Sequence, residues 1–165
     1  MKKFYFILFF ILLVANFFIY QSLFAPHITE VTVLEVGEKG DAILVRTPNG
    51  KTLLIDTGPD ASILRALGAA LPMWQRRIDA VALTSEKTVQ IGGLSDVKIR
   101  YLIPTPIHFG TIDTPYGTRL ALDGVSVAVL YTGLLNISYG STSLSISSTT
   151  SKGTYLSDGK IVTKN

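Results

Sequence analysis

The 165-residue chain contains no cysteine and only two histidines, His27 and His108. The lack of cysteine excludes disulfide bonds and thiolate metal sites. A hydrolytic metal centre needs three or more protein ligands as a rule, so two distant histidines do not predict one. We interpret His27 as a linker residue beside an apolar segment and His108 as a solvated residue in a loop, and we expect no metal and no cofactor.

Charge is also scarce, at 16% of residues against 47% hydrophobic, which predicts a packed core rather than disorder. Two of the 15 basic residues, Lys2 and Lys3, precede an apolar run, which leaves 15 − 2 = 13 bases against 12 acids. Binding of nucleic acid needs a concentrated basic face, and this near balance gives no support for one. Nucleic acid is therefore not an expected partner, although a local basic patch is compatible with the composition.

The longest apolar run covers residues 4–24. As a helix it would reach roughly 31 Å, about the thickness of the hydrocarbon core of a bilayer. Residues 1–25 therefore form either a membrane anchor or a cleaved signal peptide, and we favour the anchor because the run is longer than a typical signal core. The lysines at its start predict a single pass with the C-terminal domain outside the cytoplasm.

Residues 26–165 are expected to form one domain of short strands with a single clear helix. The helix is predicted to begin with Asp60 as N-cap and to stop at Pro72. Strands are predicted at 29–36, 42–47, 51–56, 78–84, 99–103, 125–131, 136–139 and 142–147, with a final hairpin over 154–162. The dipeptide Asn49-Gly50 predicts a tight turn between the second and third strands. This order of elements indicates a mixed α/β sandwich.

A segment rich in Ser and Thr covers residues 141–151. Such composition is compatible with a flexible tail. Leu144 and Ile146 alternate with serines, however, which fits an exposed edge strand at least as well. We expect a strand that ends near Ser147, followed by a loop.

The segment Ala82-Leu-Thr-Ser-Glu-Lys-Thr-Val-Gln-Ile-Gly-Gly-Leu94 resembles a metal-binding motif of the metallo-β-lactamase fold, Leu-Thr-His-x-His-x-Asp-His-x-Gly-Gly-Leu. The four ligand positions of that motif are occupied here by Ser85, Lys87, Val89 and Gln90. Serine and glutamine are weak ligands for such metals, valine is none, and an ammonium group repels a cation. The segment therefore keeps the frame of the motif without its ligands.

Further stretches resemble the extracellular metallo-β-lactamase-like domain of the competence (ComEC) DNA-uptake proteins. They occur in the order of that family, at residues 33–50, 54–59, 63–68, 71–74 and 78–84. The resemblance implies a reduced, C-terminally truncated β-sandwich derived from the αββα arrangement. Three features depart from it: an extra Lys39 with Glu35 in place of an aspartate, a helix after Leu94 squeezed to almost nothing, and no later Thr-Gly-Asp or Gly-His-His-Gly motif.

The remnant of the family site comprises Asp56, Ser85, Lys87 and Gln90. The resemblance implies that Asp56 points toward the metal-site loop, where it can accept backbone N–H bonds and hold a turn. Ser85 and Lys87 admit a second interpretation, as a serine nucleophile with a lysine base. The spacing differs from the helical Ser-x-x-Lys arrangement, so we favour an exposed polar loop without catalytic residues.

These observations lead to a first hypothesis of a membrane-anchored, non-catalytic domain with a binding or structural role, for which the resemblance implies a link to DNA uptake. The alternative is a metal-dependent hydrolase acting on phosphodiesters or nucleic acid. A third hypothesis is a fragment completed by a protein partner, because a shortened sheet leaves strand edges to be covered.

Overall fold

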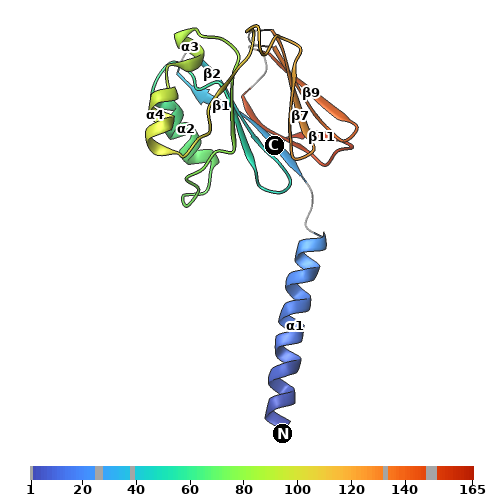
Figure 1. Ribbon diagram of the computed structural model, residues 1–165. Helices are drawn as coiled ribbons and strands as arrows, with labels where there is room; N and C mark the ends of the chain where they lie inside the picture. The colour runs from blue at the N-terminus through green and yellow to red at the C-terminus, as the bar shows by residue number, and fades with distance from the viewer. Residues whose placement is uncertain (1, 25–27, 38–39, 132–133, 148–151) are drawn as a thin grey trace.

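The computed structural model describes residues 2–24, 28–37, 40–131, 134–147 and 152–165. Figure 1 shows a single N-terminal helix, α1 (Lys2–Phe24), that extends from a globular part of two packed sheets and three short helices. Among the described residues, no helix combines the length and hydropathy required to cross a membrane. His27 and the alternative cleavage point after Ala25 lie outside the described residues.

The larger sheet has seven strands in the order β11-β10-β1-β2-β3-β4-β5. The parallel pairs are β3 with β4 and β4 with β5, and the other pairs are antiparallel. The strands are β1 (Thr29–Val36), β2 (Gly40–Arg46), β3 (Thr52–Ile55), β4 (Ala80–Leu83), β5 (Ile107–His108), β10 (Gly153–Ser157) and β11 (Val162–Lys164).

The smaller sheet is antiparallel throughout, in the order β6-β7-β8-β9. Its strands are β6 (Arg119–Leu122), β7 (Val125–Tyr131), β8 (Leu134–Tyr139) and β9 (Thr142–Ser147). The predicted strand over 142–147 is confirmed, and it forms one edge of this sheet as expected. Residues 148–151 of the Ser/Thr-rich segment lie outside the described part of the chain.

Two cores lie on opposite faces of the larger sheet, because its central strands are apolar on both sides. In β2, Ile43 and Val45 pack toward the smaller sheet, whereas Ala42 and Leu44 pack toward the helices. The helices on that outer face are α2 (Ser62–Ala70), α3 (Thr88–Ile91) and α4 (Leu94–Arg100), as Figure 1 shows. The predicted strand-rich α/β sandwich is thus confirmed, with helices on one face.

The strand register aligns several strand ends. Glu30 in β1 pairs with Arg46 in β2, which pairs with Thr52 in β3, and β4 begins next to it at Ala80. We call this the proximal end, because β1 enters the sheet here after α1. The opposite end, where β3 and β4 finish, is the distal end.

The region after Leu94 corrects two expectations. Residues 94–100 form α4, so the helix after the Gly-Gly turn is not squeezed out, and the predicted strand over 99–103 is wrong. Leu94, Val97 and Tyr101 pack on the helix-side core at helical spacing. The strand was predicted because Ile99, Tyr101 and Ile103 alternate with other residues, which is the pattern of a half-buried strand.

Smaller differences concern caps and short strands. The N-cap of α2 is Ala61 rather than Asp60, although the Asp60 carboxylate accepts the N–H of Ser62 at 2.8 Å. The sequence did not predict β6. His108 is exposed, as expected for a solvated residue, but it lies in β5 rather than in a loop.

Truncation of a core side chain tests this packing. Leu54 is fully buried in β3, so Leu54→Ala should lower the free energy of unfolding by about 2–5 kcal/mol through lost burial and the cavity left behind. Ile112 is fully exposed, and Ile112→Ala should change it by less than about 0.5 kcal/mol. Urea unfolding of the full chain in nonionic detergent, followed by circular dichroism, measures both. Equal effects of the two substitutions would contradict the packing described here.

Candidate functional site

Asp56 lies at the distal end, one residue after β3, in a strained backbone conformation. Its φ is 56°, a left-handed value that aspartate tolerates better than most residues but that still costs about 1–3 kcal/mol. The side chain is buried, with 6% of its surface exposed. Its two carboxylate oxygens accept hydrogen bonds from Thr84, one from the backbone N–H at 2.8 Å and one from the hydroxyl at 2.6 Å. Asp56 therefore joins the end of β3 to the residue that follows β4.

The environment of Asp56 changes its acidity. Burial, opposed by the two hydrogen bonds from Thr84 and assisted by the nearby charge of Asp41, raises the pKa of Asp56 from 3.8 to about 6. Burial also raises the pKa of Asp41, against the lowering influence of Lys152. A proton on one of these carboxyl groups reduces the cost of keeping both in an apolar setting.

Asp41 and Asp56 line a small cavity between the two sheets. Its volume is about 20 Å³, enough for one water molecule. Thr84 and Ser147 add polar atoms, and the remaining lining residues are apolar: Val33, Ile43, Ile55, Leu135 and Ile146. The cavity is too small for an organic substrate.

The loop after β3 is held by the segment that carries the motif. The N–H of Thr57 donates to the carbonyl oxygen of Gln90 at 2.6 Å, and the Thr57 hydroxyl donates to the same oxygen at 3.2 Å. The N–H of Gly93 donates to Gly58 at 3.1 Å. These bonds use backbone atoms of the motif rather than its side chains.

The Gly-Gly pair permits this close approach. A Cβ atom on Gly92 would overlap the carbonyl of Pro59, and one on Gly93 would lie 2.6 Å from the carbonyl oxygen of Thr57. Real Cβ contacts are essentially never that short. The two glycines are therefore required by the packing of two loops, whether or not a ligand binds there.

The structure brings together some of the sequence-predicted site residues and separates others. Ser85 follows Thr84 and is half-buried, and its hydroxyl accepts the backbone N–H of Lys87 at 3.1 Å. The Lys87 side chain is exposed. Gln90 contacts the Asp56 loop through its backbone carbonyl. Ser85 therefore stabilises a turn with the backbone of Lys87, and the exposed ammonium lacks the desolvation that a lysine base requires.

The residues present do not fit the metal ions that the family resemblance implies. Asp56 is the one carboxylate among the four predicted remnant residues, and both of its oxygens accept hydrogen bonds from Thr84. Its neighbours in the motif supply a hydroxyl, an ammonium and an amide, which is a poor donor set for zinc or manganese. Within the described ranges, no group of three or more His, Cys, Asp or Glu side chains is placed to hold a metal.

Two residues at this end were missed by the sequence analysis. Asp41, at the start of β2, looked like an ordinary polar residue of a glycine-rich turn. Tyr116 comes from the loop between β5 and β6, and its hydroxyl donates to the carbonyl oxygen of Thr84 at 2.9 Å. No motif signals Tyr116, because its contact bridges 32 positions of sequence.

No protein-family model matches the sequence, and no curated protein sequence matches it. Similar solved structures include a metallo-β-lactamase with a HARLDQ motif from Cronobacter sakazakii, which is 21% identical with a TM-score of 0.43, over 60% of this chain and 48% of that one. A diphosphatase of the PhnP family is 17% identical with a TM-score of 0.49, and the match covers 70% of this chain and 63% of that one. MEM-A1, a subclass B3 metallo-β-lactamase isolated from a soil metagenome library, is 14% identical with a TM-score of 0.49. That match covers 70% of this chain and 60% of MEM-A1.

The chain thus spans between 48% and 63% of the length of these three proteins. All three belong to the metallo-β-lactamase superfamily, and none is described as a competence protein. At TM-scores below 0.5 the likeness to these proteins is partial.

Alanine substitutions at two glycines, one in the Gly-Gly pair and one in α2, should change the stability of the fold in opposite directions. Gly92→Ala should lower the free energy of unfolding by about 1–3 kcal/mol, because the new methyl group forces the Pro59 loop away. Gly68 lies within α2 with open space around its Cβ position, so Gly68→Ala should raise stability by about 0.5–1 kcal/mol. Thermal unfolding of the two variants measures the difference. A neutral Gly92→Ala would refute the close contact.

The raised pKa of Asp56 gives a pH prediction. Because the folded-state pKa lies above the unfolded value, the folded chain binds more protons, and stability due to Asp56 is complete below about pH 4. This contribution to the free energy of unfolding, on the order of 3 kcal/mol, is lost as the pH rises through about 6. Asp56→Asn, which also tolerates a positive φ, should remove most of that decline and leave the part due to Asp41, whose pKa is also raised. Urea unfolding at a series of pH values measures it.

Asp60 provides the control for this pH series. Its pKa is lowered by hydrogen bonding to Ser62, so its stabilising contribution is present at neutral pH and lost as the pH falls. Asp60→Asn should therefore leave the decline between about pH 4 and 7 in place. If Asp56→Asn retained the decline of the natural chain, Asp56 would not be its source.

Proposed function

We propose that this chain is a membrane-anchored domain of the metallo-β-lactamase type that has a binding or structural role and no hydrolytic activity. A link to DNA uptake is part of the proposal, on the strength of the sequence resemblance to competence proteins. A partner that pairs with a strand edge fits such a role, and the serine-rich β9 is an edge of the smaller sheet.

The observation that carries the proposal is the set of side chains at the ligand positions of the motif, Ser85, Lys87, Val89 and Gln90, which are poor donors for a metal ion. Asp56 lies outside those positions, and its two oxygens accept hydrogen bonds from Thr84 at 2.6 and 2.8 Å. The group is also buried and has a pKa near 6, so it is partly protonated at weakly acidic pH. Asp56 acts here as a tie between two strands.

The surrounding loop supports the same conclusion. Its attachments to the rest of the domain are the backbone carbonyl of Gln90 and the backbone of Gly93, and the Ser85 hydroxyl closes a local turn. These are structural duties. A catalytic serine would need its hydroxyl directed at a base and a substrate.

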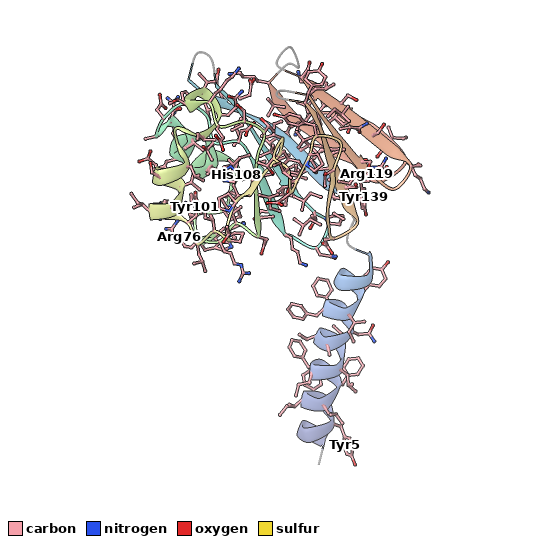
Figure 2. The ribbon with its side chains drawn as sticks, turned by 45° about the horizontal axis from the view of Figure 1, so that its top comes forward. Tyr5, Arg76, Tyr101, His108, Arg119 and Tyr139 are labelled. Carbon is pink, nitrogen blue, oxygen red and sulfur yellow. The ribbon has the colours of Figure 1, made fainter. Side chains whose placement is uncertain are left out.

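The exposed apolar surface of α1, rather than its length and hydropathy, supports the anchoring part of the proposal. Large apolar side chains project from it into solvent, and Phe6, Phe10 and Phe18 are each between 61% and 73% exposed. Figure 2 shows these rows of aromatic and aliphatic side chains along the helix. Exposure of this much apolar surface to water is unfavourable, and transfer to a lipid environment removes the cost.

Metal analysis together with a hydrolysis assay tests the proposal. The full chain, purified in detergent and equilibrated with zinc or manganese, should retain less than one metal ion per chain after gel filtration, because its site side chains are poor ligands. It should not hydrolyse bis(p-nitrophenyl) phosphate above the rate of free metal. Stoichiometric metal with a phosphodiesterase activity that chelation abolishes would overturn the proposal in favour of a metal-dependent hydrolase.

A further inference from the structure

Two of the most exposed large apolar side chains of the globular part are adjacent, in the loop between α2 and β4. Met73 is 81% exposed and Trp74 is 80% exposed. Leu102, which is 70% exposed, lies beside this loop, because its backbone N–H donates to the carbonyl of Arg76 at 2.8 Å. We call these three residues the apolar tip. Exposed tryptophan next to other large apolar residues is typical of surfaces that contact a partner or a bilayer.

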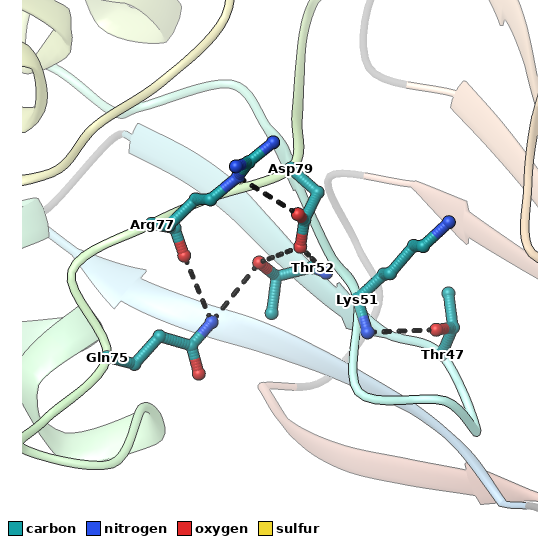
Figure 3. A network of polar contacts seen from close by, with 6 residues as sticks. All are labelled: Thr47, Lys51, Thr52, Gln75, Arg77 and Asp79. Atoms are coloured by element: carbon teal, nitrogen blue, oxygen red, sulfur yellow. Dashed lines mark hydrogen bonds and ion pairs between the residues drawn. The ribbon is translucent and has the colours of Figure 1, made fainter.

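The loop that presents the apolar tip is held in place by polar contacts, as Figure 3 shows. Asp79 accepts the N–H of Thr52 at 2.9 Å and pairs with Arg77 at 3.3 Å. The side-chain amide of Gln75 donates to the Thr52 hydroxyl and to the Arg77 carbonyl. The exposure of Met73 and Trp74 therefore belongs to a braced loop whose base is fixed to β3.

Positive charge surrounds the apolar tip. Arg76 and Arg77 lie two and three residues after Trp74, and Arg100 ends α4 close to Leu102; all three are exposed. Of the carboxylates at the same end, Glu30 is paired with Arg46 and Asp79 with Arg77, whereas Asp123 accepts hydrogen bonds from the neutral side chains of Thr47 and Asn49 and keeps its negative charge. Arg76 and Arg100 are therefore the main source of positive charge beside the tip. An apolar tip within a basic rim matches the interface of an anionic bilayer.

The position of the apolar tip relative to α1 favours a bilayer as its partner. The loop before β4 lies at the proximal end, where β1 enters the sheet, and Figure 1 shows it on the side from which α1 extends. Phe24 ends α1 and Thr29 starts β1, so the connection reaches at most about 18 Å. Three strand spacings, about 14 Å, separate β1 from β4. A bilayer that holds α1 is thus within reach of the tip.

We propose that Met73, Trp74 and Leu102, with Arg76 and Arg77, form a second membrane contact that enters the interface of an anionic bilayer beside α1. This inference rests on the proposed anchor. Arg76 lies at the lower edge of the domain in Figure 2, on the side of α1. Two attachments fix the orientation of the domain, and the distal end then faces away from the lipid.

Trp74 is the sole tryptophan of the chain and therefore a built-in fluorescent probe. The full chain should be reconstituted into phosphatidylcholine vesicles with and without phosphatidylglycerol. On the anionic vesicles we expect Trp74 emission to shift to shorter wavelength, iodide quenching to be lost, and lipids brominated near the headgroup to quench strongly. Arg76→Gln with Arg77→Gln should return the emission to its position on neutral vesicles, whereas Arg119→Gln, on the smaller sheet, should not.

A matched probe controls for position. The double variant Trp74→Phe, Ile112→Trp moves the single tryptophan to the loop after β5, which leaves the sheet at the distal end. Its emission should stay sensitive to iodide and insensitive to brominated lipid. Equal lipid quenching of the two probes would overturn the inference, because it would mean that the domain has no preferred orientation.

Flotation of the same vesicles separates this inference from the proposed anchor. If the chain floats with lipid while Trp74 remains open to iodide and is not quenched by brominated lipid, the second contact is refuted and the anchor stands. If the chain does not float, both are refuted. If Trp74 is shielded from iodide without quenching by brominated lipid, a second protein copy covers the tip and the membrane contact is refuted.

Discussion

The hydrogen bonds between Asp56 and Thr84 are the constraint on which the distal end depends. They connect the residue after β3 to the residue after β4, which are two neighbouring parallel strands of the larger sheet. Once these ends are tied, the following loops must leave the sheet side by side. Thr57 then meets Gln90, and Gly92 and Gly93 settle against the Pro59 turn. A buried carboxylate in a strained conformation is tolerated because it holds this junction together.

This arrangement separates the architecture of a metal-hydrolase site from its chemistry. In the family that the sequence resembles, the loop after β4 presents metal ligands. Here the same loop keeps its course through backbone contacts and glycines, while Ser85, Lys87 and Gln90 occupy the ligand positions. The junction does not require metal ligands, since none of its bonds uses a side chain at a metal-ligand position of the motif. The structural or binding role that we propose is consistent with a site in which only the framework of the motif is present.

Much of the fold follows from local patterns. Alternation predicts β1, and the Asn49-Gly50 turn predicts the β2–β3 hairpin, because in both cases neighbours in sequence determine the structure. The region around α4 was misread since Ile99, Tyr101 and Ile103 alternate, while the helical spacing of Val97 and Tyr101 becomes decisive only when α2 offers a surface to pack on. At the site, Asp56 was found from its motif. Asp41 and Tyr116 were not, because burial and contacts between distant loops give them their roles.

The loop of residues 85–90 has a consequence for protein engineering. Its side chains at Glu86, Lys87 and Val89 are exposed, and its last residue, Gln90, is held through its backbone carbonyl by Thr57. Substitutions of the exposed side chains change the chemistry of this segment and leave that backbone contact in place. A segment with exposed, replaceable side chains at the end of a buried sheet is a suitable place to introduce a designed metal or ligand site.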